Sequence, residues 1–197
     1  MGCQMKIKRD SLMTLEAYAK KRASFRAEVM AHKKFRKVPL GDHVTLLFEN
    51  ELTMRYQVQE ILRAEKVFEE AGIQEELEAY NPLVPDGSNW KATMLIEYPD
   101  ATERAYMLTR LKGIERRVWV QVAGGVQVFA IADEDLEREN AEKTSAVHFL
   151  RFELNAAMRQ ALRTGAMLVM GVDHPIYSVH TAIVNKVRAA LLQDITD

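Results

Sequence analysis

The sequence predicts an α+β fold: a mixed, largely antiparallel sheet of five or six strands, packed by a long N-terminal helix and several shorter helices. Three observations lead to this prediction. Segments with helical periodicity alternate with short runs rich in β-branched residues. Two apolar runs flank the pair Gly124-Gly125, which is typical of a hairpin and therefore of antiparallel pairing. Most connections between the predicted strands are either tight turns or single helices.

The 197 residues suit a single domain, 1–197, and the hydrophobic content of 48% and charged content of 28% are typical of a globular protein. No apolar run is long enough to cross a membrane, so we expect a cytoplasmic protein without a membrane partner. The net charge of −1 conceals an asymmetry. Residues 1–40 hold eleven basic and three acidic side chains, whereas residues 41–197 hold sixteen basic and twenty-five acidic ones. The domain therefore divides into a basic N-terminal helical segment and an acidic α+β body.

The first half of the chain is predicted to be mainly helical. A first helix is expected over residues 11–36, with Asp10 or Ser11 as its cap, and it should end before Pro39 and Gly41. The elements that follow are a strand over residues 43–49, a helix over 52–71 and a short acidic helix over 74–80.

The second half of the chain contains most of the predicted strands. Asp100 is expected to cap a helix, with Glu103 in the third helical position, and Asn155 and Gly165 should bracket another. The predicted strands cover residues 90–98, 117–122, 126–131, 147–154 and 167–172. A last helix is expected from Ser178 to about residue 193.

The predicted helix over residues 52–71 carries a carboxylate, Glu65, near the centre of its apolar face. That face is formed by large apolar side chains, namely Met54, Val58, Ile61, Leu62 and Phe68. A charge left buried without a partner costs several kcal/mol, so Glu65 should either be paired or line a cleft.

Arg22 interrupts the apolar stripe of the first predicted helix, and Arg26 lies beside that stripe. If the two helices pack together, an Arg22–Glu65 ion pair would satisfy both charges, and this structural interpretation is favoured. The alternative is a polar cavity that holds a small anionic or polar ligand. Its candidate residues are Arg22, Arg26, Glu49, Gln57 and Glu65.

A second group of polar residues lies just past a predicted strand, where functional groups often project. Asp173, His174 and His180 are potential metal ligands, but their spacing matches neither the usual zinc patterns nor the di-iron helix motif. The favoured interpretation is structural, with His174 in a turn and His180 in the first turn of a helix. The alternative is an iron or zinc site whose candidate ligands are Glu60, Glu65, Asp173, His174 and His180.

Three segments carry a resemblance to a known family. They are Leu47-Phe48-Glu49-Asn50 with the helix that follows it, the strand from Phe149 to Leu154, and the turn Asp173-His174-Pro175-Ile176-Tyr177. Together they resemble the bacterial family catalogued as domain of unknown function 3501, from about residue 6 to residue 194. The resemblance implies genes encoded beside rubrerythrin-like and iron–sulfur proteins, and so a role in peroxide- or sulfur-linked redox metabolism. It brings no established activity and no catalytic residue.

We therefore expect an accessory or binding protein associated with a redox or peroxide-stress system, with a protein partner or a second copy of itself as its binding partner. The alternative is an enzyme that binds a metal or a small ligand through a cluster of Glu, His and Asp side chains. A third hypothesis is nucleic-acid binding through the basic N-terminal helix, which is less favoured because phosphate binding usually needs a basic excess over the whole domain. The sequence has no Walker loop, dinucleotide-binding glycine motif or nucleophile elbow.

Overall fold

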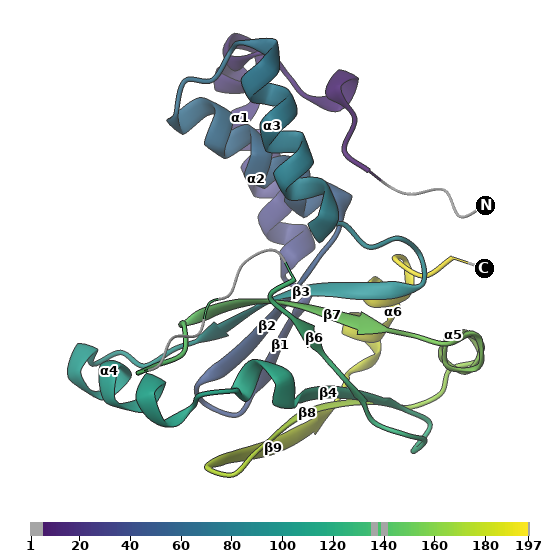
Figure 1. The fold of residues 1–197 in the computed structure, drawn as a ribbon. Coiled ribbons are helices and arrows are strands. Elements are labelled where there is room, and N and C mark those ends of the chain that lie inside the picture. Colours follow the sequence, from purple (N-terminus) through teal and green to yellow (C-terminus); the bar gives the residue numbers. More distant parts are fainter. Residues whose placement is uncertain (1–5, 135–137, 139–141, 197) are drawn as a thin grey trace.

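The computed structural model describes residues 6–134, 138 and 142–196, and its architecture is α+β, as predicted. Two antiparallel sheets enclose the main core, and three N-terminal helices project from one of them (Figure 1). No helix in the described part of the chain is long and apolar enough to cross a membrane. Because the strands form two sheets, the prediction of one sheet is wrong, whereas the fold class and the antiparallel pairing are confirmed.

The N-terminal helices are α1 (Leu15–Lys33), α2 (Glu51–Ala64) and α3 (Glu70–Tyr80), accompanied by the short 3-10 helices η1 (Arg9–Ser11) and η2 (Asn81–Leu83). Residues Arg9–Ser11 form η1, so α1 begins later than predicted, with Thr14 as its cap. Asn50 and Thr53 form a reciprocal capping box at the start of α2. That helix ends at Ala64 because Lys66 has a left-handed φ of 56°, and the predicted extension to residue 71 is wrong.

Sheet A has the strand order β1-β2-β3-β7-β6. Its strands are β1 (Lys37–Leu40), β2 (Val44–Glu49), β3 (Asn89–Ile96), β7 (Val147–Glu153) and β6 (Ile131–Ala132). Strand β1 was not predicted, because Pro39 was interpreted as the end of a helix. Proline is tolerated there because β1 is an edge strand, where a missing N–H leaves no ladder bond unmade.

Sheet B has the strand order β5-β4-β8-β9. Its strands are β5 (Val128–Phe129), β4 (Val118–Val122), β8 (Leu168–His174) and β9 (Tyr177–Ala182). The predicted strand over residues 126–131 is divided at buried Ala130, so that β5 pairs with β4 in sheet B while β6 pairs with β7 in sheet A. The chain therefore passes from sheet B to sheet A between β5 and β6.

The remaining helices are α4 (Ala101–Arg110), α5 (Ala156–Arg163) and α6 (Asn185–Leu192), with the 3-10 helix η3 (Ile114–Arg117) between α4 and β4. The predicted caps Asp100 and Asn155 are confirmed, since each side chain accepts a hydrogen bond from a backbone N–H of the first turn. The helix predicted from Ser178 is wrong in its first part, where residues 177–182 form β9. The phenol of Tyr177 there donates a hydrogen bond of 2.6 Å to the Leu40 carbonyl of β1.

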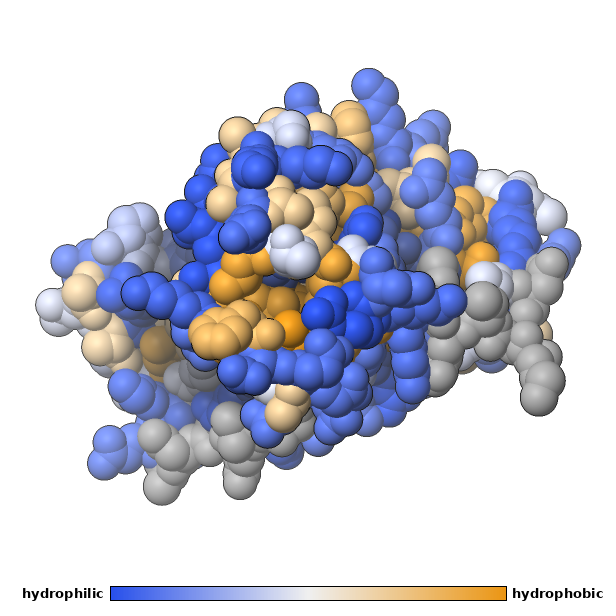
Figure 2. Space-filling view, turned by 90° about the horizontal axis from the view of Figure 1, so that it is seen from above, coloured by the Kyte–Doolittle hydropathy of each residue, from blue (hydrophilic) through white to orange (hydrophobic). Residues whose placement is uncertain are grey.

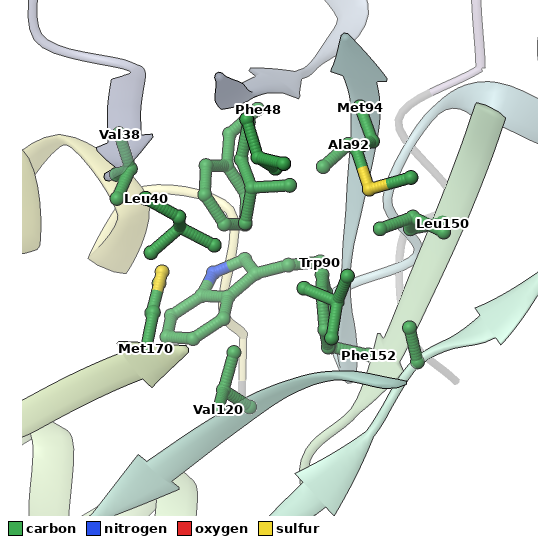
Figure 3. Packing of buried hydrophobic residues seen from close by; sticks show 14 of the residues in the cluster. Val38, Leu40, Phe48, Trp90, Ala92, Met94, Val120, Leu150, Phe152 and Met170 are labelled. Carbon is green, nitrogen blue, oxygen red and sulfur yellow. The ribbon is translucent and has the colours of Figure 1, made fainter. Parts of the chain in front are cut away.

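The main core lies between the two sheets. Trp90 of β3 is fully buried, and Figure 3 shows its ring between Phe48 of sheet A and the side chains Val120 and Met170 of sheet B. The Trp90 indole Nε1–H donates a hydrogen bond of 2.9 Å to the Leu191 carbonyl of α6. The core therefore unites both sheets with the C-terminal helix.

A buried arginine links the N-terminal part of the chain to that helix. Arg36 is 1% exposed. Its guanidinium donates hydrogen bonds to the carbonyls of Phe48 (3.0 Å), Glu49 (3.2 Å) and Ala190 (3.0 Å), and to the carboxylate of Asp194. Burial raises the pKa of Asp194 to about 6, against the opposing charge of Arg36. Arg36 thus joins strand β2 to the end of α6.

We predict that Arg36→Met lowers the free energy of unfolding by about 3–5 kcal/mol, because it leaves a buried carboxylate and three carbonyls without their partner. Urea unfolding at pH 7 measures the change. Arg36→Lys keeps the charge but cannot reach all four acceptors, so an intermediate loss is expected. Arg26→Met, at an exposed site on α1, is the control and should change stability by less than about 0.5 kcal/mol. Equal losses in Arg36→Met and the control would contradict the prediction.

Candidate functional site

The predicted Arg22–Glu65 ion pair does not form, and Glu60 is the partner of Arg22 instead. Arg22 Nε and Nη2 donate to the two Glu60 oxygens at 2.8 and 2.7 Å, and the Tyr18 hydroxyl donates to Glu60 Oε1 at 2.5 Å. Glu65 is the exposed C-cap of α2. The prediction failed because the helix ends before the apolar face centred on Glu65 is complete.

Phe68, which was assigned to that apolar face, is 71% exposed in the connection between α2 and α3. A view onto the helical end of the molecule shows apolar residues at the surface, surrounded by hydrophilic ones (Figure 2). The apolar residues that α2 does bury there, Met54, Val58 and Leu62, form a cluster with Ile73 and Leu77 of α3. Ile7 and Leu12, on either side of η1, and Val84 complete this cluster.

The other residues of the predicted ligand cavity are spread over separate surfaces. Arg26 on α1 and Gln57 on α2 are exposed. Glu49 is buried on β2, where its Oε1 accepts a hydrogen bond of 2.8 Å from the Thr93 hydroxyl. These positions do not support the predicted cavity.

The predicted metal ligands also lie apart. Glu60 and Glu65 are on α2, exposed Asp173 and buried His174 are on β8, and His180 is on β9, opposite Gly171. Both ring nitrogens of His174 are hydrogen-bonded to backbone groups and so are not available to a metal. Nδ1 accepts from the Ile176 N–H, and Nε2 lies 3.1 Å from the Lys112 carbonyl. Within residues 6–134, 138 and 142–196, no group of three or more His, Cys, Asp or Glu side chains could hold a metal ion.

The candidate site is a cavity of about 430 Å³ on the face of sheet A that points away from the main core, and we call it the sheet A pocket. Strands β3 and β7, the loop before β3, and Glu134 form it. Its polar lining residues are Asp86, Asn89, Lys91, Glu134 and Arg151, and its apolar ones are Pro82, Leu83, Phe149 and Leu150. Apolar walls with a few convergent polar groups are typical of small-molecule sites, as is this volume.

Strand alternation places the two cationic side chains of the pocket next to each other. Trp90 and Ala92 of β3 point into the core, so Lys91 points to the opposite face, and its Cα partner on β7 is Arg151. Arg151 donates hydrogen bonds of 2.7 Å to both oxygens of Glu134 and one more to Glu153. These bonds from Arg151 lower the pKa of Glu134. Arg151 is therefore already neutralised.

The loop before β3 supplies an anionic group that is also satisfied within the protein. Asp86 Oδ1 accepts hydrogen bonds from the backbone N–H and the hydroxyl of Ser88, at 2.9 and 2.8 Å. Burial alone would raise the pKa of Asp86, but these hydrogen bonds hold it below its ordinary value. Asn89 completes this side of the pocket by bonding Glu153 at 3.2 Å.

Lys91 differs from its neighbours because its ammonium makes no hydrogen bond or ion pair with any residue in the described part of the chain. Its side chain is half-buried. Burial lowers the pKa of Lys91, and so does the charge of Arg151, while Glu134 and Asp86 oppose the shift. A half-buried ammonium with unused donors is the group of this pocket best placed to bind an acidic ligand.

One wall of the pocket depends on a buried histidine that the sequence analysis missed. His148 Nδ1 lies 2.6 Å from Asp133 Oδ2, and its Nε2 lies 2.9 Å from the Thr144 hydroxyl. Asp133 also accepts a hydrogen bond of 3.0 Å from the Phe149 N–H, which fixes the neighbouring Glu134 against β7. Thr144, His148 and Asp133 are spaced like the nucleophile, base and acid of a catalytic triad, but Thr144 is 1% exposed, so its role is structural. The sequence signal for His148 was its position on the buried side of an alternating strand.

The family model described as "Protein of unknown function (DUF3501)" matches residues 6–195. The chain belongs to this family. The DUF3501 protein is also similar to a crystal structure described as a novel protein of unknown function from Burkholderia pseudomallei K96243. The two are 57% identical, the match covers 98% of this chain and 100% of the other, and the TM-score is 0.93. No curated protein matches. The family prediction is confirmed, whereas the expected association with rubrerythrin-like or iron–sulfur proteins is not shown by these comparisons.

We predict that Glu60→Gln destabilises the DUF3501 protein by about 1–2 kcal/mol at pH 7, because it removes the charged acceptor shared by Arg22 and Tyr18. Hydrogen bonds from Arg22 lower the pKa of Glu60 to about 2, from an ordinary value of 4.5. The stabilisation is therefore complete above pH 4.5 and is lost as the pH falls towards 2. Partial exposure of both side chains places the expected value at the lower end.

Urea unfolding of both proteins at a series of pH values measures this difference. Glu65→Gln is the matched control, since Glu65 is exposed, and it should change stability by less than about 0.5 kcal/mol. A larger loss in Glu65→Gln than in Glu60→Gln would restore the pairing first predicted from the sequence.

Proposed function

We propose that the DUF3501 protein binds a small organic acid in the sheet A pocket, as a non-catalytic binding protein. The observation that supports this function is the half-buried ammonium of Lys91, which makes no hydrogen bond or ion pair with a described residue and lies in a cavity with apolar walls. A ligand carboxylate would supply that partner through charge-assisted hydrogen bonds.

The charges around the pocket favour a ligand with a single acidic group. Glu134 and Asp86 line the same cavity, and the pKa of each is lowered, so both stay ionised at neutral pH. A multiply charged anion would be repelled by them, whereas one carboxylate can contact Lys91 alone. The rest of the ligand would lie against Leu83 and Phe149, which makes an aliphatic or aromatic acid the expected class.

Binding is favoured over catalysis because the acidic groups of the pocket are already engaged. Glu134 is bonded to Arg151, and Asp86 to Ser88, so neither carboxylate is poised to transfer a proton. No observation on the described residues favours the redox setting that the family resemblance implies, and the proposed role is limited to ligand binding.

We predict that 3-phenylpropionate and hexanoate raise the melting temperature of the protein, whereas their uncharged amides do not, because only the acids can pair with Lys91. Differential scanning fluorimetry detects the shift, and isothermal titration calorimetry gives the affinity. In Lys91→Met the binding of the acids should weaken by about tenfold or more, since a charge-assisted contact is lost.

Lys20→Met is the control for this experiment, because it removes the same charge from an exposed position on α1. It should bind both acids as the unmodified protein does. Lys91→Met should fold with unchanged or higher stability, since methionine avoids the cost of burying an ammonium. Equal affinities in Lys91→Met and Lys20→Met, or equal responses to the acids and their amides, would rule out the proposed function.

A further inference from the structure

A second cavity lies beside η3, at the turn between β8 and β9, and we call it the η3 pocket. Its volume is about 540 Å³, and it shares no lining residue with the sheet A pocket. Its residues include Lys112, Arg116, Arg117, His174, Phe129 and Pro175. Among the residues that the structure describes, no acidic side chain lines it. The guanidinium groups of Arg116 and Arg117 line the same cavity and repel each other, and an anion bound between them would relieve that repulsion.

The fold fixes these cations in place through the buried residues between them. Leu111 and Ile114 are fully buried, and Gly113 between them has a left-handed φ of 77°, which sets the turn into η3. His174 Nδ1 accepts the Ile176 N–H, so the ring proton is on Nε2 and is donated to the Lys112 carbonyl at 3.1 Å. His174 therefore stabilises the turn at Lys112 and Gly113, which leads into η3 and its cationic side chains.

Within the described part of the chain, Arg116 has one long ion pair and Arg117 has no acidic partner. Arg117 makes no hydrogen bond or ion pair with a described residue. Arg116 is 72% exposed at its side chain, and its contact with Glu115 is long, at 3.7 Å between Nε and Oε1. Arginine is the residue best suited to bind phosphate oxygens in a bidentate manner. Two such side chains beside a lysine form a site for a multiply charged oxyanion.

We propose that the η3 pocket binds the phosphoryl group of a small molecule, and that the ring of that molecule lies against Phe129 and Pro175. Phe129 is 40% exposed, so a flat face is accessible beside the cations. The volume fits a small molecule. The site is a basic exception within the acidic α+β body, and it does not depend on the function proposed for the sheet A pocket.

The test uses isothermal titration calorimetry on the full chain, with pyrophosphate and ADP as probes at about 20 mM salt, where charge screening is weak. Both probes should bind, and ADP should bind more tightly because its base can contact Phe129. In the double variant Arg116→Ala/Arg117→Ala, both affinities should fall by about tenfold or more. Both side chains are exposed, so the variant should fold, and losing the long Arg116–Glu115 ion pair should lower its melting temperature only slightly.

The matched control is Lys20→Ala/Arg26→Ala, which removes two positive charges from exposed positions on α1. Its affinities should stay within about twofold of the unmodified protein, since it changes only the net charge. Phe129→Ala should lower the affinity for ADP to that for pyrophosphate and leave pyrophosphate binding unchanged.

Three results would overturn the proposal. The first is the absence of heat for both probes, and the second is an equal loss of affinity in the two double variants. The third is a single-stranded oligonucleotide that binds more tightly than ADP and loses its affinity in Arg116→Ala/Arg117→Ala, which would assign the cations to nucleic acid. If Phe129→Ala leaves ADP binding unchanged, the contact between the ligand ring and Phe129 is wrong.

Discussion

The buried Arg36 guanidinium is the interaction on which the rest of the structure depends. It bonds two carbonyls at the end of β2, one carbonyl of α6 and the carboxylate of Asp194. These contacts hold α6 where the Leu191 carbonyl meets the Trp90 indole, and Trp90 fills the space between the two sheets. A hydrophobic side chain at position 36 could fill the same volume, but it could not satisfy the polar groups that converge there. The shape of the core therefore follows from one cation and its four acceptors.

Local signals in the sequence predicted local structure well. Asp100 and Asn155 cap the helices they were expected to cap, and the strand expected at residues 43–49 is β2, because capping and β-branched runs act over a few residues. The family was also identified correctly from short motifs. The errors arose where contacts between distant segments, or the end of a helix, determine the structure. Residues 178–182 form a strand because they pair with β8. The helical periodicity that placed Glu65 on an apolar face assumed a continuous helix, which ends at the left-handed Lys66.

The candidate site could not be predicted for the same reason. In the sequence, Lys91 is one lysine in an alternating strand, where an outward-pointing cation normally lies in solvent. It becomes half-buried only because the loop carrying Leu83 and Asp86, strand β7 and Glu134 meet around it. The two pockets also differ in charge. Carboxylates share the sheet A pocket with its cations, whereas the described lining of the η3 pocket includes arginines and no acidic residue. The two pockets should therefore select singly and multiply charged anions respectively.

The Arg36–Asp194 contact joins residues that are 158 positions apart in the chain. Closing so long a loop costs conformational entropy before any contact is gained, and chains rich in such distant pairings fold slowly. The strands and the N-terminal helices can form from nearer neighbours, such as the β1–β2 and β8–β9 hairpins. The docking of α6 onto Arg36 and Trp90 would then be a late step, and until it occurs the two sheets would expose apolar surface to other molecules. The same side chain that organises the finished core thus sets the order in which the core is assembled.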